Sequence, residues 1–465
     1  MNEAMNAGSI CRFRALAAAL LITQIVRGSE GGPTITQAPG PLPTTTAPVV
    51  SAAVPPPVRP NPTTLKPPEA SVPAALAYTL TNLGTLGGPT SQANAINASG
   101  QIAGGADTKS NEWHAFLYDQ GKMQDLGVLS GNGSEAMGLN DSGKIVGYIV
   151  FNLPVNVFPP PRSGAEAIQR MTTHAFLFSD GKMLDLDAGK SGNLHSRANA
   201  INASGQIAGA PFDAAAFSGG KAHSIQLPDQ HGSISPTSTA NNARAINDSG
   251  EVAGVAEIGR GYTGASPLAD AFLLDGNGWA ELGTLWGQGH LCQAFGINAS
   301  GQVVGWVALP YNIHRPEIRS GPPPGIFAGG AQAHSSVFHE TFQRITIGDA
   351  FLYAKGTMYD LGNLGGWFSF ANAINDPGQI VGLSTVADGS PHAFIHAANK
   401  MLDLNGLVSP GQFAAANITV LMEARGINRR GQIVGVARDA KGSETAFLLT
   451  PVEGNATMPA GTATK

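Results

Sequence analysis

The stretch INASGQIAG at residues 96–104 is the first of seven copies of one short phrase in this chain of 465 residues. Each copy has an apolar residue, Asn, two variable residues, Gly, one more residue, Ile or Val, Ala or Val, and Gly. The Asn of the phrase recurs at Asn97, Asn140, Asn202, Asn247, Asn298, Asn375 and Asn428. Successive copies are 43, 62, 45, 51, 77 and 53 residues apart, so the chain is built from repeated units, numbered 1 to 7 here.

The residues around the first copy predict short strands joined by tight turns. Residues 78–83 alternate between apolar and polar side chains and are rich in β-forming residues. Residues 93–96 and 101–104 are two more strands that flank a turn at 97–100, where Asn suits the first position and Gly suits a positive φ at the last. Together they form a hairpin. Residues 114–118 form a fourth strand, and residues 123–127 start the next unit.

Two further elements recur once in each unit. An Ala-Phe strand is marked by Phe116, Phe176, Phe217, Phe272, Phe351, Phe394 and Phe447. A Leu-centred strand is marked by Leu83, Leu126, Leu186, Leu227, Leu282, Leu361 and Leu404. No segment after residue 30 has a sustained period of 3.6, so we expect almost no helix.

Four strands in each of seven units predict an all-β fold, a seven-bladed β-propeller of four-stranded blades. The first unit begins with its Leu strand at 78–83, whereas the last ends with an Ala-Phe strand at 445–450 that no Leu strand follows. We expect these N- and C-terminal strands to share one blade and close the ring, which would remove two free sheet edges. A parallel β-solenoid is the alternative, although it would not explain the matched end strands or the hairpin signals.

Three motifs in fixed order carry a family resemblance. They are Asp-Leu-Gly-x-Leu-Gly-Gly, Ala-Ile-Asn-x-x-Gly-Gln-Ile-x-Gly and His-Ala-Phe-Leu, and they span residues 78–450. This compound pattern resembles the bacterial extracellular repeat family named HAF after its last triplet. The resemblance implies secretion or surface display and implies no established reaction or catalytic residue. In four units the His of the triplet is replaced, by Ala215, Asp270, Asp349 and Thr445.

The N-terminal residues have the composition of an export signal. Arg12 and Arg14 precede an apolar run at 15–26, which spans about 18 Å as a helix against a bilayer core of about 30 Å. Basic residues before a short apolar run are typical of a secretory signal, and an uncleaved interfacial segment is the alternative. We therefore expect an exported protein, extracellular, at the cell surface or periplasmic, with no transmembrane span in the mature chain.

The rest of the chain divides by composition. Residues 1–30 are the leader and 31–75 are a Pro- and Thr-rich stretch, expected to be a disordered linker. Residues 76–453 hold the repeats and 454–465 are expected to be a disordered tail. The net charge of −5 and the absence of Lys- or Arg-rich stretches argue against a nucleic-acid partner.

The candidate binding residues lie in the two longest loops between the third and fourth strands of a unit, at 148–173 in unit 2 and 306–348 in unit 5. Loops of this length usually carry function or are disordered. Insertions at one point of each repeat emerge on the same face. The titratable and aromatic side chains singled out there are Tyr311, His314, Arg315, Glu317, Arg319, His334, His339 and Glu340 of unit 5, with Arg162 and Arg170 of unit 2.

The recurring Asn and His side chains are interpreted as structural. Five of the Asn residues formally match a glycosylation acceptor, but the turn accounts for all seven, including the two without a following Ser. The triplet residues His114, His174 and His392 occur in units 1, 2 and 6, and a zinc site needs three or four convergent ligands. We therefore expect no metal and no cofactor.

The function expected from these observations is that of a monomeric binding or interaction module for an extracellular glycan or protein. No nucleophile motif, phosphate-binding loop or metal-ligand spacing is present in the sequence. The alternative is a propeller enzyme, a hydrolase or lyase acting on an extracellular carbohydrate. Carboxylates or His side chains from different units, brought together near the centre, would favour that alternative.

Overall fold

The structure is a computed structural model. It describes residues 66–70, 77–154, 169–188, 196–210, 215–218, 221–224, 242–260, 267–285, 292–308 and 348–452. Strands dominate these residues, and each of units 1 to 6 contributes four consecutive strands, while unit 7 contributes three. The all-β class predicted from the repeat is therefore confirmed.

Units 1 to 4 each form a separate four-stranded antiparallel sheet. Sheet 1 consists of β2 (Gly87–Ile96), β3 (Ile102–Thr108), β4 (Trp113–Asp119) and β5 (Lys122–Gly127). Sheet 2 consists of β6 (Gly133–Leu139), β7 (Ile145–Pro154), β8 (Gln169–Ser179) and β9 (Lys182–Asp185). Sheet 3 consists of β10 (Arg197–Ile201), β11 (Ile207–Ala210), β12 (Ala215–Ser218) and β13 (Lys221–Ser224). Sheet 4 consists of β14 (Asn242–Ile246), β15 (Val252–Arg260), β16 (Pro267–Asp275) and β17 (Gly278–Glu281).

Units 5 and 6 repeat this order, and one parallel bridge between Gly348 and Phe368 joins them into an eight-stranded sheet. Unit 5 consists of β18 (Cys292–Ile297), β19 (Val303–Ala308), β20 (Gly348–Ala354) and β21 (Thr357–Asp360). Unit 6 consists of β22 (Gly365–Ile374), β23 (Ile380–Val386), β24 (Pro391–Ala397) and β25 (Lys400–Asp403).

The last sheet combines the two ends of the repeat region. It contains β26 (Ile418–Ile427), β27 (Ile433–Asp439) and β28 (Glu444–Pro451), and its fourth strand is β1 (Tyr78–Gly84). β1 pairs antiparallel with β28, with Tyr78 opposite Pro451 and Thr81 opposite Leu448. The pairing predicted between the N-terminal Leu strand and the C-terminal Ala-Phe strand is present.

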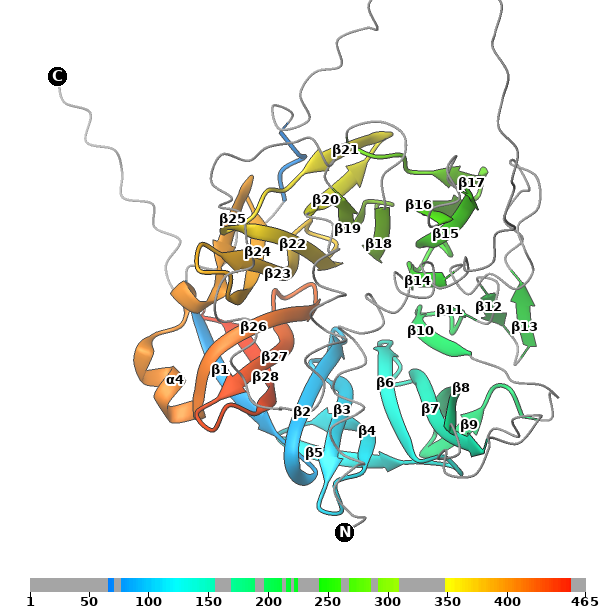
Figure 1. Ribbon diagram of the computed structural model, residues 1–465, viewed down its shortest axis with the longest axis vertical. Coiled ribbons are helices and arrows are strands. Elements are labelled where there is room, and N and C mark those ends of the chain that lie inside the picture. The colour runs from blue at the N-terminus through cyan, green and yellow to red at the C-terminus, as the bar shows by residue number, and fades with distance from the viewer. Residues whose placement is uncertain are drawn as a thin grey trace, which may run out of the picture.

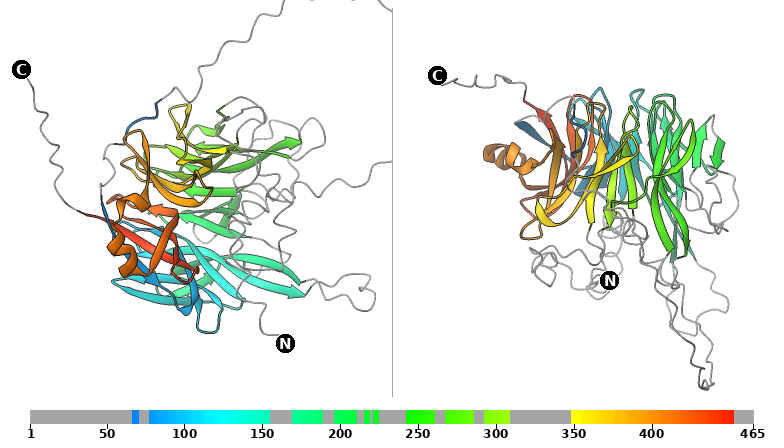
Figure 2. Two further views of the ribbon diagram at one scale, coloured as in Figure 1. Left: turned by 60° about the vertical axis from the view of Figure 1, so that its left-hand side comes forward. Right: turned by 90° about the horizontal axis from the view of Figure 1, so that it is seen from above.

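The first strand of every unit lies nearest the centre of the molecule, and the sheets stand side by side around it (Figure 1). These innermost strands contact one another in chain order, from β2 to β6 and onward to β26, and β26 contacts β2 again. Within each unit the neighbouring strands are antiparallel, unlike the parallel strands of a β-solenoid. The side views show the β7–β8 hairpin extending beyond the neighbouring strands (Figure 2).

Each repeated Asn joins its own turn to the turn of the next unit. Asn97 Oδ1 accepts from the backbone N–H groups of Ser99 and Gln101, and Asn97 Nδ2 donates to the carbonyl of Asn140 at 3.2 Å. The same bond to the following Asn is present at Asn140, Asn202, Asn247, Asn298 and Asn375, with lengths of 3.0–3.2 Å. Asn428 then donates to the carbonyl of Asn97 at 3.0 Å. The turn interpretation of these buried Asn residues is confirmed.

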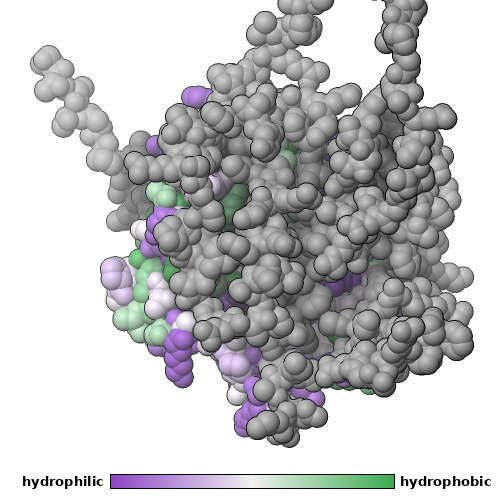
Figure 3. Space-filling view, in the orientation of Figure 1, coloured by the Kyte–Doolittle hydropathy of each residue, from purple (hydrophilic) through white to green (hydrophobic). Residues whose placement is uncertain are grey.

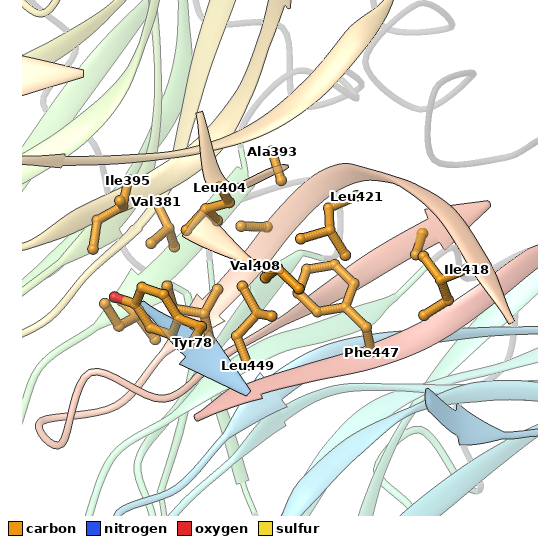
Figure 4. Packing of buried hydrophobic residues seen from close by; sticks show 14 residues of the cluster. Tyr78, Val381, Ala393, Ile395, Leu404, Val408, Ile418, Leu421, Phe447 and Leu449 are labelled. Atoms are coloured by element: carbon orange, nitrogen blue, oxygen red, sulfur yellow. The ribbon is translucent and has the colours of Figure 1, made fainter. Parts of the chain in front are cut away.

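The hydrophobic core is divided into layers between neighbouring sheets. The Phe of the Ala-Phe strand is fully buried at Phe116, Phe176, Phe272, Phe351, Phe394 and Phe447. In the layer between units 6 and 7, Phe447 packs with Tyr78, Leu421 and Leu449 of the last sheet and with Ile395 of β24 (Figure 4). Tyr78 of β1 is therefore part of this core as well as of the strand pairing.

A short helical segment covers the outer edge of β1. η2 (Leu404–Leu407) and α4 (Pro410–Ala416) lie between β25 and β26, and they are the helices of the described residues. The Gln412 side chain of α4 accepts from the Leu80 N–H at 2.7 Å and donates to the Tyr78 carbonyl at 3.3 Å, and Asn82 Nδ2 donates to the Ala416 carbonyl. Hydrophilic and hydrophobic residues are interspersed on this flank (Figure 3).

The structure corrects the predicted ends of several elements. The unit 2 loop predicted at 148–173 is partly strand, because β7 continues to Pro154 and β8 begins at Gln169. The Leu of the outer strand is not central in units 2, 4, 5 and 6, where the strand ends one residue before Leu186, Leu282, Leu361 and Leu404. In unit 3 the outer strand is β13 (Lys221–Ser224), and Leu227 lies outside the described residues.

Part of the predicted linker contacts the repeats. Residues 66–70 are described, and Asn399 Nδ2, in the turn between β24 and β25, donates to Glu69 Oε1 at 2.9 Å. This end of the linker therefore has a defined place against unit 6. The leader, residues 31–65 and 71–75 of the predicted linker and the tail from residue 454 lie outside the described residues.

Candidate functional site

Every innermost strand has a β-bulge at the same repeat position, three residues before the Asn of its turn. In β2, Ala93 is opposite Gly104 and Ala95 is opposite Ala103, so Asn94 is an extra residue with no partner in the pairing. The equivalent register shift occurs in the other six innermost strands, β6, β10, β14, β18, β22 and β26. Bulges re-aim side chains and are frequent beside functional sites, so the side chains at this position are candidates for ligand contact.

The bulge explains the last Gly of the repeated phrase. A Cβ at Gly104 would overlap the carbonyl oxygen of Gln92 and come within 2.9 Å of the Phe116 ring. The same clash with the facing carbonyl recurs at Gly147, Gly209, Gly254, Gly305, Gly382 and Gly435. The bulge, the Gly and the buried Phe therefore form one packing unit, and only a residue without a side chain fits between them.

At two positions of each innermost strand the residue type varies from unit to unit. One is the bulge residue, three before the Asn, and the other lies five before the Asn, while the residue between them is Ala in every unit. We call these positions the inner belt. Its members are Gln92, Asn94, Glu135, Met137, Arg197, Asn199, Asn242, Arg244, Gln293, Phe295, Phe370, Asn372, Glu423 and Arg425.

The inner belt joins each unit to the next. Asn94 Nδ2 of unit 1 donates to Glu135 Oε1 of unit 2 at 2.9 Å, and Asn199 Nδ2 of unit 3 donates to Asn242 Oδ1 of unit 4 at 2.7 Å. The bulge residue likewise reaches the following unit in the pairs Arg244–Gln293, Phe295–Phe370, Asn372–Glu423 and Arg425–Gln92. Units 2 and 3 are joined through Tyr148 of β7. The guanidinium carbon of Arg197 lies 4.5 Å from the centroid of the Tyr148 ring.

Units 7, 1 and 2 contribute the ionic part of the belt, in which acidic side chains surround one Arg. Arg425 forms an ion pair with Glu423 at 2.8 Å and donates to Gln92 at 2.6 Å and to Asn94 at 3.0 Å. Burial disfavours the charged guanidinium, but the carboxylates of Glu423, Glu135 and Glu444 outweigh this cost and raise the pKa of Arg425 above its ordinary value. Its positive charge is therefore permanent.

Units 3 to 6 contribute cationic, amide and aromatic groups. The Arg244 guanidinium lies 4.9 Å from the centroid of the Phe295 ring, a cation–π distance. Phe295 is 6.4 Å from Phe370, and the Trp306 ring stacks on Phe370 at 5.6 Å. Neither belt position of these four units holds an acidic residue.

The triplet His residues tie the third strand of a unit to its outer strand. His114, His174 and His392 each contact, through Nδ1, an Asp eleven residues later, at 3.0, 3.0 and 2.7 Å. In the last sheet Thr445 donates instead to Asn82 of β1 at 2.9 Å. These contacts agree with the structural interpretation of the His residues. Among the described residues no three His, Cys, Asp or Glu side chains are grouped as a metal site would need.

Unit 4 replaces this His–Asp pair with two acids. Asp270 stands at the His position and Glu281 stands eleven residues later, at the Asp position. Asp270 is buried, and its burial together with the Glu281 carboxylate raises the pKa of Asp270 to about 8. An acidic side chain at this place therefore holds a proton at neutral pH.

The loop residues predicted from the sequence lie outside the described part of the chain. Tyr311, His314, Arg315, Glu317, Arg319, His334, His339 and Glu340 belong to residues 309–347, and Arg162 belongs to residues 155–168, which are not described. Arg170 lies in β8, whose backbone is described there while its side chain is not.

Sequence reasoning missed the inner belt although the signal was present. The repeat has Ala, a variable residue, Ala or Gly, Ile or Leu, and Asn. The variable residue is Asn, Met, Asn, Arg, Phe, Asn and Arg in units 1 to 7, whereas its neighbours hardly change. The conserved Asn and Gly of the repeat predict the fold, whereas the candidate ligand contacts lie at the variable positions between them. A comparison of the seven copies, position by position, identifies the belt.

The chain matches no family model and no curated protein. Among solved structures it is similar to TolB from Acinetobacter baumannii, at 13% identity and a TM-score of 0.32, over 73% of this chain and 76% of that one. It is also similar to a Mycobacterium tuberculosis puromycin-hydrolyzing peptidase, at 10% identity and a TM-score of 0.32, over 76% of this chain and 57% of that one. Overlaps this low carry no argument about function. No helix among the described residues is long and apolar enough to cross a membrane.

Proposed function

We propose that this chain is an exported seven-bladed β-propeller of the HAF repeat type that binds an extracellular glycan through its inner belt. The seven groups of four strands, the β1–β28 pairing and the bonds that run from each Asn to the next and back to Asn97 support the propeller. The three motifs over residues 78–450 support the family, and the basic and apolar leader supports export.

The observation that carries the binding function is the inner belt itself. The fold needs a bulge and a Gly at these places, but it does not need Asn, Met, Arg or Phe at the bulge. The same position holds four residue types in seven structurally equivalent places, and each side chain contacts the neighbouring unit. Convergent polar groups beside aromatic rings are typical of small-molecule sites.

The state of the two belt carboxylates favours binding over catalysis. Glu135 accepts from Asn94 and from the Tyr148 hydroxyl, and Glu423 accepts from Arg425 and Asn372. A general acid or base must exchange a proton with its substrate, and these hydrogen bonds hold the oxygens as acceptors within the protein. We therefore prefer a module that recognises a ligand without transforming it.

A glycan array tests the proposal, with the full chain applied at physiological salt. We expect binding to a restricted set of glycans, and Phe295→Ala should weaken it by about tenfold because the ring belongs to the belt. Phe413→Ala is the matched control, since this half-buried Phe of α4 lies away from the belt and should leave binding unchanged. Absence of glycan binding, or equal losses in both variants of equal thermal stability, would contradict the proposal.

Export is tested separately from binding. The full chain should be recovered outside the cytoplasm of a bacterial host, and deletion of residues 2–30 should retain it inside. Recovery of both forms in the cytoplasm would contradict export. This result would not bear on glycan binding, which the array tests.

A further inference from the structure

The inner belt is electrically uneven. In units 7, 1 and 2 the side chains of Glu423, Arg425 and Glu135 lie in one hydrogen-bonded group with Gln92 and Asn94. This part has two acids against one Arg. The polar groups of these side chains mostly bond to one another across the unit boundaries. This part of the belt is therefore better suited to joining the units rigidly than to contacting a ligand.

The belt positions of the opposite part hold two arginines and no acidic residue. Arg197 and Arg244 come from the neighbouring units 3 and 4, and no belt residue of units 3 to 6 is acidic. Arg197 makes no ion pair with any described residue, and its guanidinium rests on the Tyr148 ring at 4.5 Å. An Arg held over an aromatic ring is oriented while its N–H groups keep their capacity to donate.

Amides and aromatic rings continue from these arginines. Asn199 and Asn242 are hydrogen-bonded to each other between the two Arg-bearing units. Arg244 of β14 contacts Phe295 of β18, and Phe295 contacts Phe370 of β22. The sequence of groups around the belt is therefore cation, amide, cation, aromatic, aromatic.

We propose that units 3 to 6 bind a uronate, a pyranose ring that carries a carboxylate, as part of an acidic glycan. This inference rests on the proposed glycan-binding function and names its ligand class. The Arg197 and Arg244 guanidinium groups suit the carboxylate, because Arg pairs with carboxylates through two parallel N–H donors. The Asn amides suit ring hydroxyls, which both donate and accept, and the Phe rings suit the apolar C–H face of a pyranose.

Titration calorimetry with a defined pair of probes tests the ligand class. Trigalacturonate and its trimethyl ester share the same pyranose rings and ring hydroxyls, but the ester carries neutral methyl carboxylates in place of the charged carboxylates. Benzoate supplies a carboxylate on an aromatic ring without hydroxyls. The full chain should bind trigalacturonate at least about tenfold more tightly than the ester or benzoate, and this preference should shrink as salt is raised.

Matched arginine variants locate the site. Arg197→Gln should weaken trigalacturonate binding by about tenfold and bring its affinity close to that of the ester, while Arg197→Lys should retain part of the preference. Arg430→Gln is the control, because Arg430 is exposed on the unit 7 turn and outside the belt. Thermal unfolding of each variant identifies any loss that is due to misfolding.

The outcomes separate the two proposals. If the array finds a neutral glycan that depends on Phe295, and trigalacturonate and its ester bind equally, the uronate inference is wrong and the glycan-binding proposal stands. Tighter binding of benzoate than of trigalacturonate, or full trigalacturonate affinity in a folded Arg197→Gln variant, also overturns the inference. If no glycan binds at all, both proposals fail.

Discussion

At the scale of single residues, the positions that build the fold are nearly the same in all seven units, and the positions that vary are different ones. The Asn of each turn and the Gly behind each bulge meet requirements that no other side chain meets as well: one bonds two turns together, and the other leaves room for a carbonyl and a Phe ring. The bulge residue meets no such requirement. Its identity is therefore open to selection by a ligand.

Asp270 gives a prediction at this scale. Because its pKa is about 8 in the folded protein against 3.8 in an unperturbed Asp, the folded state keeps a proton that the unfolded chain releases between these values. Asp270 should thus lower the free energy of unfolding as pH rises from about 4 to about 8, by at most about 1.4 kcal/mol per pH unit. Burial lowers the pKa of His396 to about 4, and this opposite contribution offsets the fall below about pH 6.5, so the net fall is expected between about pH 6.5 and 8. Denaturant titrations across this range measure the slope.

Two substitutions at Asp270 sharpen this test. Asp270→Asn should remove most of the slope, and Asp270→His should pair with Glu281 in the manner of His174 and Asp185 and stabilise the protein near neutral pH. Asp180→Asn, in an exposed turn, should leave the slope unchanged. A slope that survives in Asp270→Asn would show that another group is responsible.

At the scale of elements, the segment between β25 and β26 protects a sheet edge. β1 is the outer strand of the last sheet, and unpaired edge strands are prone to further pairing. The Gln412 side chain accepts a hydrogen bond from the N–H of Leu80 and donates one to the carbonyl of Tyr78, as the backbone of a neighbouring strand would do. α4 therefore serves as a cover in place of a fifth strand.

Gln412→Ala should lower the free energy of unfolding by about 1–2 kcal/mol, because it leaves these two backbone groups without their side-chain partner. Amide hydrogen exchange should increase at Leu80 more than in β26. Gln124→Ala, at an exposed place on β5, is the control and should change neither quantity. Unchanged exchange at Leu80 in Gln412→Ala would contradict the role given to α4.

Strand order and pairing were predictable because each unit repeats the same turn chemistry, so seven weak signals reinforced one another. The exact strand ends were not predictable. Pairing between β7 and β8 continues into the segment predicted as a loop, and the outer strands of units 2, 4, 5 and 6 end one residue before their Leu. α4 was missed because its seven residues, PGQFAAA, are too few for a periodic pattern. The belt was missed for another reason: its positions are recognised only when the seven copies are compared, because the residues that vary there follow no local pattern.

At the scale of the whole molecule, one sheet depends on both ends of the repeat region. The bond from Thr79 to Thr450 joins residues 371 positions apart, and the bond from Asn428 to Asn97 joins residues 331 positions apart. Loop closure over such distances costs entropy that only the completed contacts can offset. The stability of the first and last units should therefore be coupled.

Removal of residues 1–85, which deletes β1, should lower the melting temperature of the remaining chain, because Tyr78 leaves its core and β28 becomes an edge. A synthetic peptide of residues 77–85 should restore part of the loss in a concentration-dependent manner. Removal of residues 1–65 alone is the control. An unchanged melting temperature without β1, measured by calorimetry, would contradict the coupling.

The pairing of β1 with β28 also sets an order in time. A ribosome releases β1 first and β28 last, so throughout synthesis the strand that will close the last sheet has no partner of its own. Arg425 likewise meets Gln92 only after nearly all the repeats have been made. If the chain crosses a membrane, it would thus arrive with its last sheet incomplete, and the contact between Arg425 and Gln92 would form only after the whole repeat region had crossed.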